Sequence, residues 1–475
     1  MSTTHTIAGS GQSLARPAIL VVLGFAGVIG ALMQTMVLPL LPLFPAMFNV
    51  SVSAASWIAT STMLVGAIGA PLLGWLGDRY GLKPMIILAL ALLAVGSLMS
   101  ALAGDLGTMI AGRVLQGFSV GIVGLSLALL RRLWHIDGLP LAVGIIGGTI
   151  GIGTSLGVPL AGLIVAFGSW QAIFWVMGIA AILAALLVAV FVPAIPAMSR
   201  QRFDLAGAMG LGLILTLVLL PLSTFVDGQL GLGAVLAWLA VAAVLLVIWL
   251  WHQLRVAAPF VDLRLLLVPA ISSSHLIALF LGFAFFLSFT ATITVTQMPA
   301  DGGVGLGGSV LLTGLVQLPA SLISILAPPL AGFMVSRLGA RPAIATGIIV
   351  AIVAFALRAI DLGHGPAIAA SAMFVSGGIS FAFAALPVAL MGATPADRLG
   401  ATNGFNMLSR QMGAAAASVT GAAIVATTID FIHPSGPDAF YWLFGLGGAS
   451  AALALILSLG TTSLNSLPTN RETRR

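Results

Sequence analysis

Charged residues are scarce in this chain. Only 6% of its 475 residues are Asp, Glu, Lys or Arg, whereas 60% are apolar, and the mean hydropathy is +1.18. Soluble domains carry about 25% charged residues, so this composition excludes an ordinary soluble protein. A helix needs about 20 apolar residues to cross a bilayer, and charge-poor runs of that length recur along the whole chain. We therefore expect an all-α polytopic membrane protein.

Residues for covalent and metal chemistry are also missing. The chain has no cysteine, which excludes disulfides, thiolate metal sites and cysteine nucleophiles. It contains no GxxxxGK[ST] phosphate loop, so ATP is not indicated as a direct energy source. No carboxylate pair or metal-ligand cluster emerges at catalytic spacing. We expect no enzyme activity, no cofactor and no metal site.

The net charge of +6 does not indicate nucleic-acid binding, because the basic residues are scattered among short connections. Such scattering is what orientation in a membrane requires.

Apolar runs separated by charged or turn residues predict fourteen transmembrane spans. An even number places both termini on one side of the membrane. The first run is too long for the core of a signal peptide, so we expect it to be retained as a span. The predicted spans are 18–46, 54–76, 85–104, 107–130, 141–167, 171–194, 204–225, 231–251, 270–293, 308–335, 342–361, 365–392, 401–428 and 440–462.

With these spans, the basic and acidic residues of the connections fall on opposite sides of the membrane. One side holds the basic residues of the connections and tails, so by the positive-inside rule we expect both termini to be cytoplasmic in the cell membrane. The other side holds acidic residues and no loop Lys or Arg. The basic set is Arg16, Arg79, Lys83, Arg131, Arg132, Arg200, Arg202, Arg255, Arg264, Arg337, Arg341, Arg398, Arg471, Arg474 and Arg475, and the acidic set is Asp105, Asp227, Asp301, Asp361, Asp430 and Asp438.

The chain contains an internal repeat. The stretch Gly332–Arg341 after the tenth span resembles Gly74–Pro84 after the second, with Ser336 in the position of Asp78. Matching these spans predicts two six-helix bundles separated by two inserted helices, as in repeat-built transporters. The expected parts are an N-terminal tail 1–17, a first bundle 18–198, the inserted pair with its connectors 199–265, a second bundle 266–465 and a C-terminal tail 466–475.

The stretch from Gly74 predicts a cluster of charged residues where the second span leaves the membrane. Asp78 is positioned to pair with basic residues and with the N-terminal end of the thirteenth span, which would hold the cytoplasmic side shut. The alternative is that these charges only set topology. The residues of this predicted lock are Gly74, Asp78, Arg79, Gly81, Lys83, Arg131 and Arg132.

Two cations fall inside predicted spans. Arg113 lies about 8 Å into the fourth span, before Gln116 and Gly117, and Arg410 lies inside the thirteenth. Residues of this kind usually face a bundle interior or a watery cavity and mark a pathway, although snorkelling is the alternative for Arg113. Arg358 stands near a span end, and we expect it to snorkel outward. Arg410 shares a predicted polar stripe with Asn403, Asn406 and Gln411.

Several other residues have both a functional and a structural interpretation. His275 is a titratable group in the ninth span, either a proton carrier or an interfacial histidine satisfied by a neighbouring hydroxyl. Gly153 and Gly157 form a GxxxG face and Pro159 bends the fifth span, which favours a tight inter-helix seam. Candidates to line a mostly apolar substrate cavity, each more often packing than ligand, are Gln34, Trp57, Gln297 and Gln317.

These motifs resemble those of the major facilitator superfamily, and nearly the whole chain is covered. Gly74, Asp78, Arg79, Gly81 and Lys83 match its signature between helices two and three, with Leu82 in place of a basic residue. The fourth-helix motif resembles Arg113, Gln116 and Gly117, and the antiporter motif resembles Gly153, Gly157, Pro159 and Gly162 with Val158 inserted. Fourteen spans, Trp57, Pro259–Arg264, Thr296–Pro299, Gly404–Asn406 and Arg410–Gln411 resemble its drug:proton antiporter branch.

The resemblance implies an exporter of amphipathic drugs, antibiotics or metabolites that alternates access and exchanges protons, with Asp78 as the lock. The acidic residue typical of the first helix in that branch is absent, and only Gln34 stands nearby. His275 and Asp78 remain as proton-carrier candidates. The expected partners are a small amphipathic substrate, protons and lipid, with a monomeric protein. The alternatives are a facilitator or importer of a neutral metabolite and a non-transporting membrane sensor.

Overall fold

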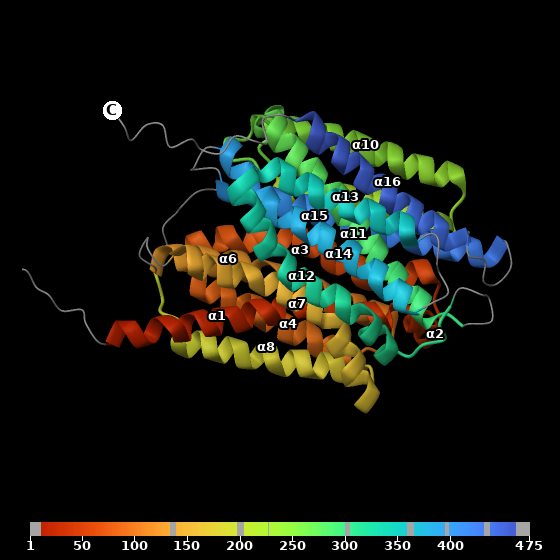
Figure 1. Ribbon diagram of the computed structural model, residues 1–475, viewed down its shortest axis with the longest axis horizontal. Coiled ribbons are helices and arrows are strands. Elements are labelled where there is room, and N and C mark those ends of the chain that lie inside the picture. Colours follow the sequence, from red (N-terminus) through yellow and green to blue (C-terminus); the bar gives the residue numbers. More distant parts are fainter. Residues whose placement is uncertain are drawn as a thin grey trace, which may run out of the picture.

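The structure is a computed structural model that describes residues 11–133, 139–196, 204–226, 228–299, 305–358, 365–394, 399–431 and 438–461. Within these ranges the regular structure is entirely helical, and the long helices run side by side (Figure 1). Thirteen segments are long and apolar enough to cross a membrane, and α15 (Leu399–Phe431) is a further long helix packed against its neighbours. The all-helical, fourteen-span prediction is thereby confirmed.

The helices form two bundles of six spans and an inserted pair. In the first bundle, α1 continues through η1 into α2, and α5 continues through η2 into α6, so that each group makes one span. The first bundle comprises α1 (Gly11–Met36), η1 (Leu38–Leu43), α2 (Phe44–Phe48), α3 (Val52–Tyr80), α4 (Leu82–Ala101), α5 (Leu106–Gly117), η2 (Phe118–Val120), α6 (Gly121–Leu133), α7 (Leu139–Phe167) and α8 (Gln171–Phe191). The inserted pair is α9 (Leu205–Val226) and α10 (Leu232–Arg255). After η3 (Leu265–Leu267), the second bundle comprises α11 (Pro269–Gln297), α12 (Val310–Leu338), α13 (Ala340–Arg358), α14 (Gly365–Ala393), α15 and α16 (Asp438–Gly460).

The two bundles repeat the same packing. The pairs α1–α7 and α4–α8 in the first bundle have counterparts in α11–α15 and α13–α16, and the bundles meet through α3–α15 and α7–α12. The turns that follow α3 and α12 also have a similar backbone conformation, because Gly81 and Gly339 both have positive φ, 106° and 90°. Beyond each turn a cation binds the end of the last helix of its bundle. Lys83 Nζ donates to Ala189 O at 2.8 Å, and Arg341 Nε donates to Ser458 O at 3.1 Å.

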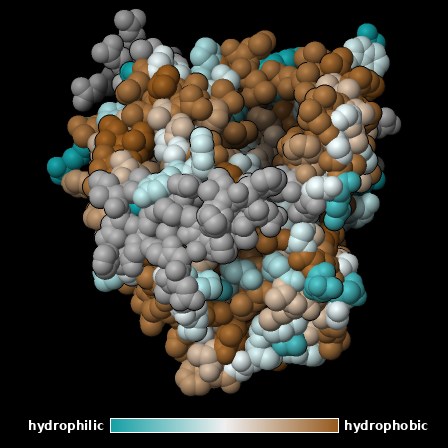
Figure 2. All heavy atoms as spheres, turned by 90° about the vertical axis from the view of Figure 1, so that its right-hand side faces the viewer, coloured by the Kyte–Doolittle hydropathy of each residue, from teal (hydrophilic) through white to brown (hydrophobic). Residues whose placement is uncertain are grey.

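We call the end of the molecule where α1 begins and α16 ends the terminal face, and the end carrying η1 and α2 the opposite face (Figure 1). Figure 2 looks onto the opposite face, where hydrophobic residues cover most of the described surface. Residues 1–10 of the predicted N-terminal tail, the predicted C-terminal tail, the connector residues 199–203 and the charges at positions 227, 301, 361 and 398 lie outside the described residues, whereas residues 11–17 of the predicted N-terminal tail belong to α1.

The main core lies across both bundles. One cluster joins Leu32 and Met36 of α1 to Ala278 and Leu281 of α11. A second cluster, which includes Leu23 of α1 and other residues from α3 to α8, belongs to the first bundle alone. The inserted pair covers the α3–α15 seam, because α9 packs against both of these helices.

A buried carboxylate fixes the inserted pair to the following connector. Asp204 immediately precedes α9 and is 7% exposed. Its carboxylate accepts hydrogen bonds from Gly207 N (2.8 Å), Gln253 Nε2 (2.7 Å) and Phe260 N (3.1 Å) and lies 2.7 Å from His252 Nε2. Burial alone would raise the pKa of Asp204, but the hydrogen bonds from His252 and the other donors outweigh it and lower the pKa below its usual value.

Asp204→Asn should destabilise the fold at neutral pH. A carboxylate whose pKa is lowered by folding contributes stability above its unfolded pKa of about 3.9, and that contribution is lost as the pH falls through the folded pKa. We expect the variant to lose about 2 kcal/mol of unfolding free energy at pH 7. It should also lose the part of the acid sensitivity that Asp204 causes.

Thermal unfolding in detergent at pH 7 and at pH values below 4 measures both effects. The matched control is Asp262→Asn in the same connector, where the partly exposed carboxylate accepts a backbone hydrogen bond from Arg264. Equal melting of Asp204→Asn and the unmodified protein at every pH would refute the role given to this carboxylate.

Candidate functional site

The bundles approach each other most closely where α7 meets α12. A Cβ added to Gly162 would lie 2.7 Å from the carbonyl oxygen of Val310, and one added to Gly314 would lie 3.1 Å from Cα of Pro159. The Ser321 hydroxyl donates across the same seam to the carbonyl of Ser155. The small residues of the predicted antiporter motif thus lie at two contacts, since Gly153 and Gly157 face α1 and Gly162 faces α12.

Hydrogen bonds between the bundles lie between mid-depth and the opposite face. Among the described residues, Gln297 Nε2 donates to Pro39 O at 2.7 Å, and Thr60 Oγ1 donates to Ser418 Oγ at 2.9 Å. Near mid-depth, Gln411 Nε2 donates to Gln34 Oε1 at 3.3 Å. Gln34, Gln297 and Gln411, predicted to line a cavity, therefore connect the two bundles here. The described part of the molecule is in a state that is closed at the opposite face.

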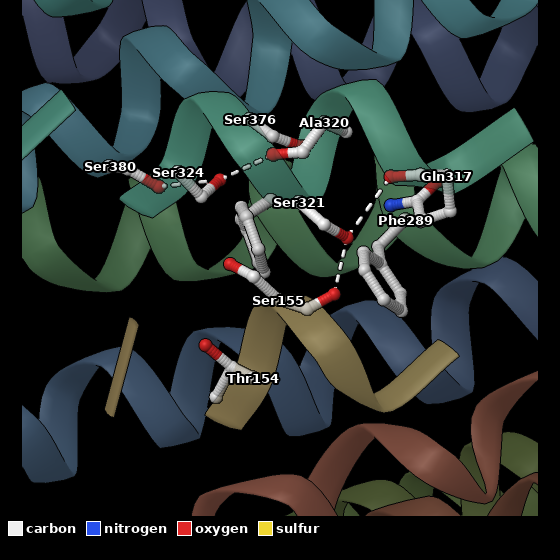
Figure 3. A pocket seen from close by; sticks show the side chains of 10 residues that line it. Thr154, Ser155, Phe289, Gln317, Ala320, Ser321, Ser324, Ser376 and Ser380 are labelled. Carbon is white, nitrogen blue, oxygen red and sulfur yellow. Dashed lines mark hydrogen bonds between the residues drawn. The ribbon is translucent and has the colours of Figure 1, made fainter. Parts of the chain in front are cut away.

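A small polar cavity lies against the α7–α12 seam (Figure 3). Its volume is about 40 Å³, which is room for a few waters or one polar substituent. The lining residues come from α7, α11, α12 and α14 and are Thr154, Ser155, Phe285, Phe289, Gln317, Ala320, Ser321, Ser324, Ser376 and Ser380.

Gln317 is the one predicted cavity residue that lines this pocket. It is 1% exposed, and its Oε1 has no hydrogen-bond partner among the described residues. Around it, Ser324 Oγ donates to Ala320 O at 2.8 Å, and Ser380 Oγ donates to Ser324 Oγ at 3.2 Å. A buried amide oxygen without a partner is costly, so the pocket favours a hydrogen-bond donor from water or from a ligand.

Arg113 lies deep in the first bundle and is 1% exposed. Its Nε donates to Ile58 O at 3.1 Å, its Nη1 donates to Met33 O at 3.3 Å, and Nη1 also donates to Gln116 Oε1 at 2.6 Å. Gln116 in turn donates to Ser97 Oγ at 3.1 Å. The cation is held by carbonyl dipoles of α1 and α3 and does not snorkel, and its role in a transport pathway stays a prediction.

Gly117 lies beside this network. A Cβ there would be 2.9 Å from Thr62 O, so glycine allows α5 to contact α3 closely.

Arg410 lies in the second bundle between α14 and α15. Its guanidinium lies 5.2 Å from the ring centroid of Phe383, its Nη2 contacts Met407 Sδ at 3.3 Å, and the side chain is partly exposed. The predicted stripe on α15 divides, because Asn406 Nδ2 donates to Ser274 O at 3.0 Å on α11 instead.

His275 is enclosed between α11 and α15. It is 5% exposed, its ring meets Phe405 edge to face at 4.6 Å, and its Nδ1 lies 3.5 Å from Asn406 Nδ2. The neighbouring Ser274 hydroxyl donates to Ala270 O. The contact of the imidazole is thus with an amide and an aromatic ring, and proton carriage by His275 remains a prediction.

The predicted lock divides into an ion pair and separate contacts. Arg132 Nη2 lies 2.6 Å from Asp78 Oδ1, which joins α6 to α3 inside the first bundle. Arg131 is exposed, and Arg79 stacks on Trp75 at 5.5 Å. Gly74 makes no close helix contact, since no described atom lies within 4 Å of a Cβ built there.

Two further cavity candidates lie apart from the polar pocket. Trp57 Nε1 donates to Ser223 Oγ at 3.1 Å and thereby joins α3 to the inserted helix α9. Asn403 is partly exposed near the start of α15.

Arg358 does not snorkel, and that expectation is wrong. It is 1% exposed between α11, α13 and α16, where Nη1 donates to Ser288 Oγ at 3.2 Å and Nη2 donates to Thr292 Oγ1 at 2.5 Å. Its guanidinium lies 4.5 Å from the ring centroid of Phe444. The sequence correctly placed Arg358 near a helix end. Its side chain nevertheless points into the bundle, because hydroxyl groups and an aromatic face bind the guanidinium there.

The serines of the polar pocket are the main residues that sequence reasoning missed. Ser321 follows Gln317 by four residues and Ser380 follows Ser376 by four, so each pair shares one helix face. That spacing was the available signal. It is weak because serines are common in these helices and usually bond their own backbone.

Comparisons with known proteins agree with this architecture. The sequence profile described as Major Facilitator Superfamily matches residues 23–418. A triacylglyceride transporter of Mycolicibacterium hassiacum is 29% identical over 382 residues, which are 74% of this chain and 68% of that protein. The tetracenomycin C resistance and export protein of Streptomyces glaucescens is 26% identical over 406 residues, 81% of this chain and 71% of that protein.

A crystal structure of a D-xylose-proton symporter has a TM-score of 0.68 and 18% identity over 95% of this chain and 99% of that one, which shows the fold alone. The aligned segments cover 64% to 71% of the relatives' own lengths.

Gly153→Val should separate α1 from α7. A Cβ at Gly153 would lie 2.7 Å from Val28 O and 3.0 Å from Leu32 N, and backbone atoms cannot turn away as side chains can. We expect a loss of about 1–3 kcal/mol in unfolding free energy, measured by thermal unfolding in detergent. Gly445→Val on α16 is the control, because a Cβ there meets no described atom within 4 Å. Equal melting of the two variants would contradict the close α1–α7 contact.

Proposed function

This chain belongs to the Major Facilitator Superfamily and is a multi-pass membrane transporter, and we propose that it exports small amphipathic compounds by alternating access, in exchange for protons. The observation that carries the proposal is the position of the contacts between the bundles. Glycine-mediated contacts and hydrogen bonds join the bundles from mid-depth to the opposite face. Such contacts can be exchanged for contacts at the other end when one bundle rocks against the other.

We assign the terminal face to the cytoplasm. The basic residues Arg79, Lys83 and Arg341 all lie at this face, which supports the assignment by the positive-inside rule. Under it, the described state is closed to the outside, as a transporter collecting a cytoplasmic substrate requires. The name of the tetracenomycin relative, a resistance and export protein, supports the same direction.

The Asp78–Arg132 ion pair is proposed as the lock of the cytoplasmic side. In the described state it joins two helices of the same bundle, and it does not connect the bundles. We propose that closure of the cytoplasmic side brings the N-terminal end of α15 to this pair, where the helix dipole favours a carboxylate. Ser336 stands at the equivalent position in the second bundle, so the lock is one-sided.

The proton carrier is proposed to be His275. It is a titratable side chain buried between α11 and α15, and α15 also packs against α3 of the first bundle. A charge change at this place would alter the packing of a helix that takes part in the bundle contact. Arg113, fixed by carbonyls of α1 and α3, is proposed to keep the first bundle rigid next to the pathway.

A second candidate function is facilitated passage of a neutral compound without proton coupling. It is favoured by the positions of the acidic residues in the described helices. Asp78, Asp430 and Asp438 each stand within two residues of a helix end, so no carboxylate lies at mid-membrane there. The two candidates differ in whether a pH gradient drives transport.

Transport into everted membrane vesicles tests the proposal. The vesicle lumen corresponds to the cell exterior, so a lumen one pH unit more acidic should accelerate uptake of a fluorescent amphipathic dye and raise its steady-state accumulation up to about tenfold over vesicles without a gradient, because one pH unit supplies about 1.4 kcal/mol of driving force. His275→Gln should keep the basal rate and lose the acceleration. His364→Gln, in the connection between α13 and α14, is the control.

Equal rates with and without the gradient would remove proton exchange and leave the facilitator. Vesicles that take up none of a set of fluorescent amphipathic dyes, anionic, neutral and cationic, would overturn the proposed export.

A further inference from the structure

The interior of the described helices carries positive charge, and none of the acidic residues of these helices lies at mid-depth. Arg113, Arg358 and Arg410 all lie inside the described helices, away from their acidic residues. Two of these guanidinium groups are enclosed by hydrogen-bond acceptors, whereas Arg410 is partly exposed and, among the described residues, contacts a ring face and a thioether. A cation entering this interior would meet repulsion without a compensating carboxylate, and an anion would find one available partner.

The polar pocket presents hydrogen-bond acceptors. The hydroxyl groups of Ser321 and Ser324 donate to backbone carbonyls, and that of Ser380 donates to Ser324, so each has used its one proton and can offer a ligand only an acceptor. Gln317 Oε1 adds an acceptor that is buried and has no partner among the described residues. A ligand that satisfies this pocket must therefore supply O–H or N–H donors.

The pocket and Arg410 lie on one line of α14. Ser380 lines the pocket and Phe383, which contacts Arg410, follows it by three residues, so both share one helix face about 4.5 Å apart along the axis. Aromatic surface lies at both ends of this line. Phe285 and Phe289 stack at 5.8 Å beside the pocket, and Phe383 lies under the guanidinium.

We propose that this line from the serine pocket to Arg410 is a binding site for hydroxylated aromatic anions, with a hydroxyl group at Gln317 and Ser321, the rings against the phenylalanines, and a carboxylate or phenolate at Arg410. The inference rests on the proposed export function and specifies its substrate class. The cavity of about 40 Å³ takes only the hydroxyl end of such a molecule, and the ring and the anion extend toward α15.

Binding of two dyes with the same ring system tests the charge preference. In buffer below the pKa of its phenol, fluorescein is a carboxylate anion that keeps a phenolic O–H group, whereas rhodamine 123 is a cation, and fluorescence anisotropy with the purified full-length protein measures both. We expect fluorescein to bind about tenfold or more tightly than rhodamine 123. Equal binding, tighter binding of rhodamine 123 or no binding of either dye would overturn the proposal.

Variants of Arg410 assign the preference to one residue. Arg410→Gln should weaken fluorescein binding about tenfold, Arg410→Lys should restore part of it, and Arg410→Glu should reverse the order of the two dyes. Arg337→Gln is the matched control, because Arg337 also stacks on a phenylalanine, at 4.3 Å from the Phe333 ring centroid, but is exposed at the terminal face. Unchanged fluorescein binding by a folded Arg410→Gln variant would overturn the assignment.

The hydroxyl subsite is tested with the monomethyl ether of fluorescein, which lacks the phenolic O–H group. The unmodified protein should prefer fluorescein, and Gln317→Leu should remove the difference between the two dyes. A difference that persists in Gln317→Leu would overturn this part of the site. Binding is independent of transport, so a protein that binds fluorescein but does not move it in everted vesicles would refute the export function and leave the site intact.

Discussion

Backbone approaches backbone where α7 meets α12, because Gly162 and Gly314 leave no side chain between the two helices. This contact joins one bundle to the other at the opposite face, and the pairing of α3 with α15 repeats it on the other side of the pseudo-symmetry. Apolar side chains alone provide little drive for helix association in a membrane, so close backbone contact and hydrogen bonds must supply it. Contacts of this kind form or break as a unit, which favours two discrete arrangements of the bundles.

The distribution of charge follows from the cost of burying charged groups in a membrane. Burying a cation in a membrane is costly, and Arg113 and Arg358 are retained because carbonyl and hydroxyl oxygens and an aromatic face receive them. Arg410 is the exception, with a ring and a sulfur atom as its contacts. Asp204 shows the opposite solution outside the membrane, where four donors offset the burial of one carboxylate. Arg113 and Arg358 are thus held by acceptors on neighbouring helices, and Arg410 is the guanidinium proposed to bind a ligand.

Much of the fold could be predicted from the sequence, because a span is defined by length and hydropathy, which are local properties. The repeat was visible for the same reason, since Gly81 and Gly339 both occupy a backbone conformation that favours glycine. Side-chain direction was not predictable. The depth of Arg358 followed from its position, but its burial depends on hydroxyls of another helix. The serine pocket depends on four helices meeting, and nothing local in a serine indicates which neighbour it will face.

Spin-label distances test most directly whether the two bundles alternate about the α7–α12 contact. The chain has no cysteine, so label pairs can be introduced without other changes, at the exposed positions Phe167 and Leu312 for the opposite face and Tyr80 and Leu338 for the terminal face. Double electron–electron resonance in lipid, with and without substrate and at two pH values, should show the first distance lengthening as the second shortens. If neither distance changes, or if both distances change in the same direction, the result would contradict alternating access in this protein.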